Sequence, residues 1–282
     1  MAYVNYDGKL KTAGTAFFNE QSRGLRYGDG LFETIRLQGG ELILADDHFA
    51  RLWKGMQALH FDIPRLMSPE FLKEEISRTS ERNGLKDARV RLSIYRAGGG
   101  LYDPENLRPI FIIETSPLDK HISGWNENGL SIGIYEKSRK MADGFSHLKT
   151  NNFLPYLLAA FEAKEQRWND ALVLNQYDRV ADSTIANLFI VKGQEIFTPA
   201  LAEGCIAGIM RKYLITSARE QGYTVHESQI SPADVYGADE CFLTNSIRGI
   251  RWVKQCHTAA YTCQFTQQLY LRLRETNPAV FC

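Results

Sequence analysis

The chain has no net charge and no long apolar run. Its 33 lysines and arginines balance its 33 aspartates and glutamates, so no overall field attracts nucleic acid or an anionic membrane. No stretch reaches the roughly 18 apolar residues of a membrane-spanning helix. The N-terminus also lacks the charged-then-apolar layout of a signal peptide. We therefore expect a cytoplasmic protein without nucleic-acid or membrane partners.

Signatures of metal sites and disulfides are missing as well. The 5 cysteines are odd in number and include no Cys-x-x-Cys pair, so we expect buried thiols. The 6 histidines include no His-x-x-x-His pair. The sequence therefore predicts no metal site.

What the chain does have is the composition of a globular protein with a substantial core, 44% apolar and 23% charged residues. Its organisation predicts an α+β or α/β protein of two domains. Residues 1–117 alternate short strands with two helices and form a small N-terminal domain. Residues 118–127 are polar and without periodicity, which is typical of an interdomain connection. Residues 128–282 form a larger C-terminal domain of mixed strands and helices.

Local patterns predict several elements of the two domains. The Asp7-Gly8 and Gly39-Gly40 pairs predict hairpin turns. A helix is expected over residues 46–60, capped by Asp46 or Asp47, and a second over residues 68–83, begun by Ser68-Pro69. The remaining expected elements are strands at 88–96, 109–114, 130–135, 171–175, 188–191 and 241–244, and helices at 154–166, 209–220 and 266–276.

Two glycines flank Asp29 just before a β-rich run. Gly28-Asp29-Gly30 indicates a tight bend that brings the following strand against another segment. A hairpin bulge explains the same pattern with fewer assumptions, and we prefer it from the sequence alone.

A lysine, an acid and a glycine turn follow one another in the second half of the chain. Lys149 precedes an Ala-rich helical segment, Asp182 lies in a loop of small residues, and Gly208 begins a Gly-Ile-Met-Arg turn. A pyridoxal phosphate site needs a lysine for the Schiff base, an acid for the pyridinium nitrogen and backbone amides for the phosphate. Each residue alone has an ordinary alternative, for Lys149 a solvated surface lysine and for Asp182 a loop cap.

Six motifs in order resemble the class IV aminotransferase family, the fold-type IV pyridoxal phosphate enzymes. The resemblance runs from Tyr27 to about Val253. The motifs are Tyr27-Gly28-Asp29-Gly30, His48-Phe49-Ala50-Arg51-Leu52, Lys149-Thr150-Asn151-Asn152, Asp182 with Asn187-Leu188-Phe189, Gly208-Ile209-Met210-Arg211 and Phe242-Leu243-Thr244-Asn245. The resemblance implies a two-domain enzyme with pyridoxal 5′-phosphate as cofactor and a homodimeric assembly.

The resemblance also implies roles for individual residues. Lys149 would hold the cofactor and then act as the base at the substrate α-carbon, and Arg51 would bind the phosphate. Asp182 would pair with the ring nitrogen, although the family normally has a glutamate there, so its shorter side chain needs a closer strand or a bridging water. The remaining cofactor-binding candidates are Asn187, Gly208, Ile209, Met210 and Thr244; Met210 replaces a threonine and offers only its backbone amide.

The reaction is less strongly indicated than the cofactor. Asn152, three residues after Lys149, and Thr34, a candidate catalytic residue, resemble the branch that contains 4-amino-4-deoxychorismate lyase. That enzyme releases pyruvate and leaves 4-aminobenzoate for folate biosynthesis, and it is our first choice. A branched-chain or D-amino-acid transaminase is the alternative, because the loop Gly98–Tyr102 lacks a second arginine. A binding protein without catalysis is a remote third, which an intact Lys149 disfavours.

Substrate contacts are the least determined part of the site. Arg96, Arg248 and Arg91 are the candidates to bind a substrate carboxylate, with a surface ion pair as the ordinary alternative for each. Further substrate-binding candidates are Tyr27, Phe32, Tyr95 and Asn245.

Overall fold

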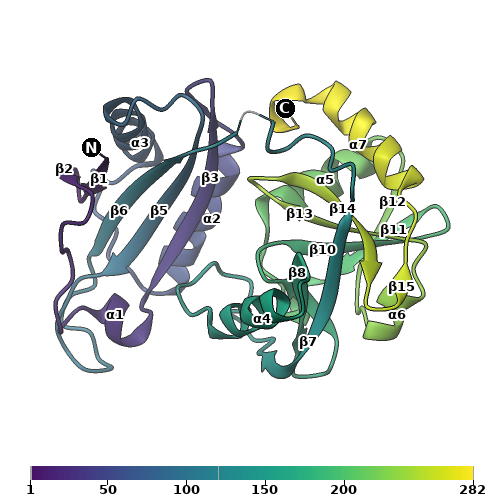
Figure 1. Cartoon of the computed structure of the whole chain (residues 1–282). Coiled ribbons are helices and arrows are strands. Elements are labelled where there is room, and N and C mark those ends of the chain that lie inside the picture. Colours follow the sequence, from purple (N-terminus) through teal and green to yellow (C-terminus); the bar gives the residue numbers. More distant parts are fainter. Residues whose placement is uncertain (1, 120, 282) are drawn as a thin grey trace. The chain divides into compact units, whose positions relative to one another are not determined.

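The computed structural model describes residues 2–119 and 121–281, which form two compact units. The first unit contains the described residues before His121 together with Leu148–Asn152. The second contains His121–His147 and the described residues from Phe153 onward. Each unit combines a sheet with helices (Figure 1).

The first unit is built on a six-stranded sheet. Its strand order is β2-β1-β6-β5-β3-β4, and every neighbouring pair is antiparallel. The strands are β1 (Tyr3–Tyr6), β2 (Lys9–Thr12), β3 (Gly30–Gln38), β4 (Glu41–Leu42), β5 (Ala88–Arg96) and β6 (Pro109–Pro117). Asp7 and Gly8 have φ of 50° and 81°, the backbone of the tight turn predicted between β1 and β2.

Helices cover one face of this sheet. They are α2 (Ala45–Ala58) and α3 (Pro69–Arg82), whereas the short helix α1 (Arg23–Tyr27) packs against Tyr95 of β5. Leu52 and Met56 of α2 and Ile76 of α3 share one core with alternate residues of β3 and β5, among them Ile35 and Leu92. Because side chains alternate along a strand, the residues between these project from the opposite face.

The predicted start of α2 is wrong in one respect. The helix begins at Ala45 after Leu44, and no side chain caps it. Asp46 and Asp47 lie in the first turn, where their charges interact favourably with the helix dipole. In α3 the prediction is confirmed, since Ser68 Oγ accepts a hydrogen bond of 3.2 Å from the Phe71 amide.

The second unit contains a nine-stranded mixed sheet. Its main path is β12-β11-β10-β13-β14-β7-β8-β9, with β15 paired to β14. The strands are β7 (Leu130–Lys140), β8 (Asp170–Asn175), β9 (Val180–Ser183), β10 (Asn187–Lys192), β11 (Glu195–Pro199), β12 (Thr224–Ser228), β13 (Glu240–Asn245), β14 (Gly249–Cys256) and β15 (Ala259–Ala260). Three neighbouring pairs are parallel: β11 with β12, β14 with β7, and β7 with β8.

The second unit has four α-helices and two short 3₁₀ turns in its described residues. They are α4 (Leu154–Glu165), η1 (Leu201–Glu203), α5 (Ile209–Glu220), α6 (Pro232–Tyr236), α7 (Gln264–Thr276) and η2 (Pro278–Val280). The inner face of α4 buries Tyr156, Ala159 and Ala163 against β7 and β8. Its outer face leaves Leu154, Leu157, Leu158 and Phe161 between 38% and 65% exposed.

The structure can be compared with two expectations from the sequence, buried thiols and the absence of a membrane-spanning helix. Cys205, Cys241 and Cys256 are buried free thiols and Cys263 is half-buried, while Cys282 lies outside the described residues. Burial raises the pKa of the Cys205 thiol to about 12, so it stays protonated. Within the described ranges, no helix has the length and apolar character needed to cross a membrane.

Candidate active site

The segment that carries Lys149 joins the start of β3 as a short extra strand. Leu31 and Thr150 form an antiparallel bridge, and the Phe32 amide donates a hydrogen bond of 2.9 Å to the Lys149 carbonyl. The Asn151 amide donates to the carbonyl of Gly30 at 3.0 Å. These main-chain bonds fix the position of Lys149 on the first unit.

The glycines of the Gly28-Asp29-Gly30 motif permit this approach. Gly28 ends α1 with φ of 62°, and a Cβ on Gly30 would collide with the Ile94 carbonyl and lie 2.7 Å from Asn151 Nδ2. The preferred hairpin bulge is therefore wrong, because the motif is a helix end followed by a strand that receives the lysine segment.

Lys149 lies on the face of β3 that α2 and α3 do not cover. Its Nζ is 4.5 Å from the centre of the Phe32 ring, and the guanidinium of Arg91 is 3.9 Å from the same centre. Thr34 projects from the same face as Phe32 and pairs across the sheet with Arg91. The structure thus brings Lys149, Phe32, Thr34 and Arg91 together, and the ring attracts both cations.

Beneath this strand, the opposite face of β3 holds a buried ionic cluster. Glu33 is 1% exposed, and its Oε1 accepts a hydrogen bond of 2.7 Å from Arg51 Nε. Glu33 Oε2 accepts from Arg51 Nη2 at 2.5 Å and lies 2.6 Å from His48 Nδ1. The two bonds to Glu33 hold the guanidinium in a fixed orientation.

Charges in this cluster shift the pKa of two of its members. Burial alone would raise the pKa of Glu33, but Arg51 and His48 lower it to about 2. Burial lowers the pKa of His48, against the opposing effect of Glu33, and Arg51 and Lys149 add to the lowering. We conclude that His48 is neutral and donates Nδ1–H to an ionised Glu33.

Arg96 does not lie on the sheet face that carries Lys149. It projects into the core side of β5, where its Nε donates to Asp29 and its Nη2 donates 2.6 Å to the carbonyl of Leu59. Its guanidinium also stacks 4.2 Å from the Phe61 ring. These contacts give Arg96 a structural role within the first unit and do not direct its guanidinium toward Lys149.

The two tyrosine candidates lie near the N-terminal segment of the first unit. Tyr95 follows the Arg91 face of β5 and packs edge-on against Phe18. Tyr27 ends α1, is 36% exposed and packs against Tyr102, with Arg23 over its ring.

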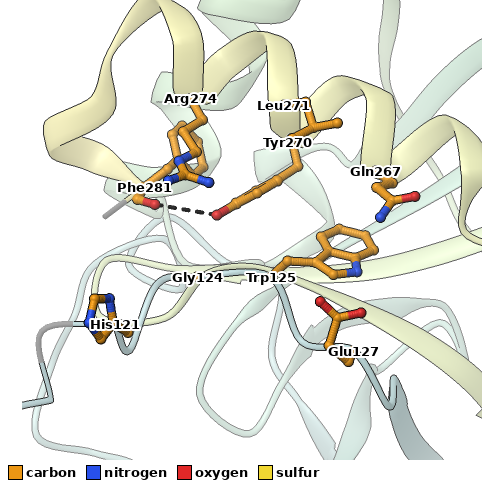
Figure 2. Close-up of a pocket in the computed structure, with 9 residues that line it drawn as sticks. All are labelled: His121, Gly124, Trp125, Glu127, Gln267, Tyr270, Leu271, Arg274 and Phe281. Atoms are coloured by element: carbon orange, nitrogen blue, oxygen red, sulfur yellow. Dashed lines mark hydrogen bonds between the residues drawn. The ribbon is translucent and has the colours of Figure 1, made fainter.

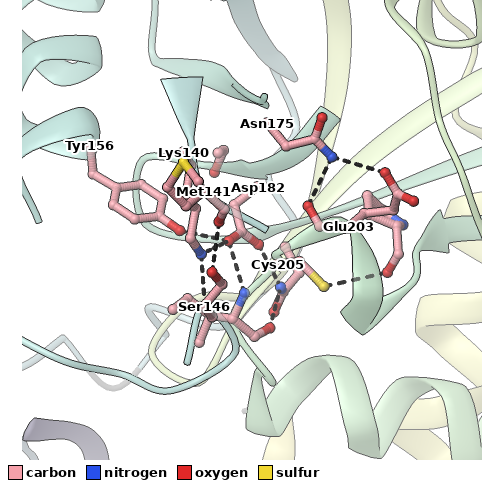
Figure 3. A network of polar contacts seen from close by, with 12 residues as sticks. Lys140, Met141, Ser146, Tyr156, Asn175, Asp182, Glu203 and Cys205 are labelled. Atoms are coloured by element: carbon pink, nitrogen blue, oxygen red, sulfur yellow. Dashed lines mark hydrogen bonds and ion pairs between the residues drawn. The ribbon is translucent and has the colours of Figure 1, made fainter. Parts of the chain in front are cut away.

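In the second unit, Asp182 lies at the centre of a polar network (Figure 3). Its Oδ2 accepts hydrogen bonds from the Tyr156 hydroxyl at 2.7 Å and the Ile206 amide at 2.9 Å, and lies 3.5 Å from Lys140 Nζ. Its Oδ1 accepts from Asn187 Nδ2 at 2.8 Å. Asp182 is 2% exposed, so these four donors compensate for most of the cost of burying its carboxylate.

Asn187 connects this acid to the predicted glycine turn. Its Nδ2 also donates 2.9 Å to the carbonyl of Ile206, two residues before Gly208. A Cβ on Gly208 would overlap Asn187 Oδ1, so only glycine fits at this point. The structure therefore places Asp182, Asn187 and the Gly208 turn side by side.

The start of α5 has the features of an anion site. Ile209 is its first residue, and the N-cap Gly208 supplies no side chain to its open amides. Thr244 of β13 pairs with Asn187 of β10 across the sheet, and its buried Oγ1 has no hydrogen-bond partner. A buried hydroxyl without a partner beside an uncapped helix start fits a phosphate group well.

The last two candidates lie in the turn after β13. Asn245 Oδ1 accepts hydrogen bonds from the amides of Ile247 and Arg248, at 3.1 and 2.8 Å, and so shapes the turn. The Arg248 side chain is exposed.

A separate hollow of about 480 Å³ lies between residues 121–127 and α7 (Figure 2). Its lining includes Trp125, Tyr270 and Phe281, and the Tyr270 ring packs against the other two rings. Exposed polar side chains such as Glu127 and Gln267 also line it. None of the predicted site residues lines it.

Sequence reasoning missed four residues of these networks, Glu33, His48, Lys140 and Tyr156. Glu33 and His48 lie inside recognised motifs, and the pairing of His48 and Arg51 three residues apart on one helix was a usable signal. No motif assigned a role to Lys140 or Tyr156. Only the folded structure shows that both contact Asp182.

Comparison with known proteins agrees with this geometry. Residues 30–256 match the family model described as amino-transferase class IV. The chain is 31% identical to aminodeoxychorismate lyase of Vibrio harveyi over 232 residues, which cover 81% of this chain and 83% of that protein. It is 30% identical to a putative branched-chain-amino-acid aminotransferase of Methanocaldococcus jannaschii, over 86% of this chain and 83% of that one.

Solved structures have the same fold. The branched-chain aminotransferase of Thermoproteus uzoniensis superposes with a TM-score of 0.87 at 25% identity, over 97% of this chain and 94% of that one. The 4-amino-4-deoxychorismate lyase of Pseudomonas aeruginosa gives 0.84 at 27% identity, over 97% and 99%.

The fold and the family match together define a pyridoxal phosphate enzyme. The chain belongs to the class IV aminotransferase family. The family's cofactor is pyridoxal 5′-phosphate, and the residues present fit it: a lysine on one unit, and on the other a buried acid, an uncapped helix start and an unpartnered threonine hydroxyl.

Proposed function

We propose that the chain is a 4-amino-4-deoxychorismate lyase, which releases pyruvate and forms 4-aminobenzoate for folate biosynthesis. The observation that carries this proposal is the position of Thr34. Its side chain projects from the same face of β3 as Phe32, and Lys149 lies over the Phe32 ring on that face. A hydroxyl there can hydrogen-bond to the oxygen that departs with pyruvate. The relative from Vibrio harveyi, which carries the lyase name, supports the same choice.

Each residue then has a defined task. Bound pyridoxal phosphate supplies an electron sink for the bond-breaking steps. Lys149 takes the proton from the substrate α-carbon and Thr34 orients the leaving oxygen. Asp182 holds the proton on the ring nitrogen. Arg51, the amides of Ile209 and Met210, and the Thr244 hydroxyl bind the phosphate.

Arg91 is the strongest candidate for the substrate carboxylate. Of the three arginines considered, Arg96 is committed to Asp29 and the Leu59 carbonyl, and Arg248 lies exposed in the turn after β13. Arg91 lies on the Lys149 face, and burial lowers the pKa of its guanidinium, with Tyr95 and Glu114 opposing the shift. A partly desolvated guanidinium binds a carboxylate more strongly than an exposed one.

A transaminase is the second candidate. The relative from Methanocaldococcus jannaschii, at 30% identity, is named as a branched-chain aminotransferase, and the loop Gly98–Tyr102 contains no arginine. Both reactions begin with proton removal by Lys149, and they differ in whether a carbon–oxygen bond then breaks.

Product analysis separates the two candidates. The purified holoenzyme is incubated with 4-amino-4-deoxychorismate, and pyruvate and 4-aminobenzoate are measured. The Lys149→Ala protein should release neither, and Thr34→Val should release them roughly a hundredfold more slowly than Thr34→Ser. Amino-group transfer from D-alanine or branched-chain L-amino acids to 2-oxoglutarate, without pyruvate from aminodeoxychorismate, would instead identify a transaminase.

We also propose that the enzyme is a homodimer that uses the outer face of α4. Leu154, Leu157, Leu158 and Phe161 recur at three- and four-residue spacing, so they form one apolar stripe. Exposed apolar stripes of this kind are typical of interfaces between subunits. The cytoplasmic location stays a prediction.

A further inference from the structure

The acid of the second unit has a buried cation beside it. Lys140, the last residue of β7, is 9% exposed, and its Nζ lies 3.5 Å from Asp182 Oδ2 (Figure 3). The same Nζ lies 5.2 Å from the centre of the Tyr156 ring, whose hydroxyl donates to the same oxygen. In the described part of the chain, Lys140 is the only cation paired with Asp182.

The donors are distributed unequally over the two carboxylate oxygens. Oδ2 receives Tyr156, the Ile206 amide and Lys140, whereas Oδ1 receives only Asn187. Each carboxylate oxygen has two lone pairs, and the Lys140 contact at 3.5 Å is the longest of the three at Oδ2. Oδ1 accepts from one donor only, so we assign its second lone pair to a ring N–H.

A ring nitrogen and an acid that share one proton can distribute it in two ways. The proton stays on the ring only if the carboxylate is the weaker base of the two. Burial makes a carboxylate a stronger base, and an adjacent cation makes it a weaker one. Three neutral donors, from Tyr156, Asn187 and the Ile206 amide, stabilise the Asp182 carboxylate by hydrogen bonds. Lys140 is the one partner among these four that adds a positive charge.

We propose that Lys140 is a positioning residue that keeps Asp182 ionised, so that the proton stays on the ring nitrogen of the cofactor. This inference rests on the proposed role of Asp182. It deepens that role by naming the group that makes an aspartate sufficient where the family usually has a glutamate.

The charges near Lys140 offset part of the effect of its burial. Burial lowers the pKa of Lys140, and the carboxylates of Asp182 and Asp143 oppose that lowering without reversing it. Burial and Asp182 raise the pKa of Tyr156 well above its ordinary value, so the phenol stays neutral and donates. The Cys205 thiol, with its raised pKa, also stays neutral.

Lys140 has a second contact that the test must separate from its charge. Its Nζ donates 2.9 Å to the Ser146 carbonyl, in the loop that leads to Lys149. Lys140→Gln retains a hydrogen-bond donor without the charge, and Lys140→Arg retains both. Lys137→Gln is the matched control, because Lys137 lies on the same strand but pairs with Glu162 at the surface.

The test reads the cofactor ring directly, in the absence of substrate. Each protein is reconstituted with pyridoxal phosphate labelled with ¹⁵N in the ring, and the nitrogen chemical shift distinguishes a protonated from a neutral ring. Wild type, Lys140→Arg and Lys137→Gln should show a protonated nitrogen. Lys140→Gln should move toward the neutral value and bind the cofactor about tenfold more weakly, and Tyr156→Phe should move less.

The outcomes distinguish this inference from the role on which it depends. If Asp182→Asn shifts the nitrogen signal and Lys140→Gln leaves it at the wild-type value, the proposal for Lys140 is wrong. If neither substitution shifts it, the role of Asp182 itself is wrong. Should Lys140→Gln fail to fold, Lys140→Arg decides: a protonated ring supports the proposal, and a neutral ring in the folded protein overturns it.

Discussion

Glu33 shows how one buried residue sets the geometry around it. It lies on the core face of β3, directly between Phe32 and Thr34 of the Lys149 face, and it holds Arg51 and His48 on the other side of the sheet. The position of the proposed phosphate arginine therefore depends on an acid that itself touches neither substrate nor cofactor in the proposed mechanism.

The pKa of Glu33 predicts a pH-dependent stability. Because the folded pKa is about 2 against an ordinary 4.5, its contribution is fully present above pH 4.5 and is lost as the pH falls toward 2. The shift corresponds to about 3 kcal/mol. We expect Glu33→Gln to lower the free energy of unfolding at pH 7 by roughly this amount, and by about half as much or less at pH 3, in urea titrations.

Glu74 provides the control for this experiment, because it is exposed on α3. Glu74→Gln should leave the free energy of unfolding nearly unchanged at both pH values. A Glu33→Gln effect of equal size at pH 7 and pH 3 would show that packing, and not charge, is what Glu33 supplies.

Arg91 leads to a prediction about substrate binding. Removing one charge-assisted hydrogen bond costs about 1.5–3 kcal/mol, or roughly tenfold to a hundredfold in affinity. Arg91→Gln should therefore raise KM for aminodeoxychorismate by this factor and leave cofactor affinity unchanged. Steady-state kinetics with Arg248→Gln, an exposed arginine, serve as the comparison, and an equal rise there would transfer the role to Arg248.

The sequence indicates candidate site residues more readily than it indicates their surroundings. Lys149, Asp182, Asn187 and Gly208 could be proposed from the sequence because each lies in a short motif whose chemistry is local. Lys140 could not, since it is 42 residues from Asp182 and has no pattern that marks a buried lysine. The contact between Lys140 and Asp182 depends on the parallel pairing of β7 with β8. The register of that pairing cannot be read from the sequence of either strand alone.

At the scale of elements, the junction of β10 with α5 depends on a missing side chain. A methyl group on Gly208 would overlap Asn187 Oδ1 and push Asn187 away from Asp182. Such overpacking typically costs about 1–3 kcal/mol. Gly208→Ala should weaken pyridoxal phosphate binding by about tenfold or more, measured by equilibrium dialysis.

Gly144→Ala is the control for this prediction, since nothing lies within 4 Å of a Cβ at that position. Its cofactor affinity should match that of the wild type. Wild-type affinity in a folded Gly208→Ala protein would remove the glycine turn from the proposed phosphate site.

Helix α4 provides a prediction about assembly. Leu157 and Phe161 lie one turn apart on its exposed stripe, at 55% and 65% exposure. Burying such side chains contributes about 1.5–3 kcal/mol each, so charges in their place should abolish a dimer that uses this face. We expect the Leu157→Glu, Phe161→Glu double variant to be monomeric in light scattering while wild type is dimeric.

Leu66→Glu changes an equally apolar side chain in the first unit, 88% exposed and not on α4, and should leave the mass unchanged. A double variant that remains dimeric would move the interface to another surface.

For the whole molecule, the sequence predicted the two-unit α/β class because periodicity changes clearly along the chain. Predicted helices such as 209–220 agree with the structure to the residue, because a Gly start and an amphipathic stripe are local signals. The order of strands in the two sheets could not be predicted from the sequence. It depends on pairings such as β14 with β7, which lie more than a hundred residues apart.

The short stretch Leu148–Asn152 belongs to the first unit, although the residues on both sides of it belong to the second. A ribosome that has completed residue 120 has not yet made the strand that pairs with Leu31, nor the lysine it carries. The first unit therefore cannot finish folding until about thirty further residues have emerged, which is a delay that long-range pairing imposes on folding. For the same reason, no cut between the units divides this gene into two independent halves: a fragment that ends at the apparent boundary would lack the segment of Lys149 that pairs with its sheet.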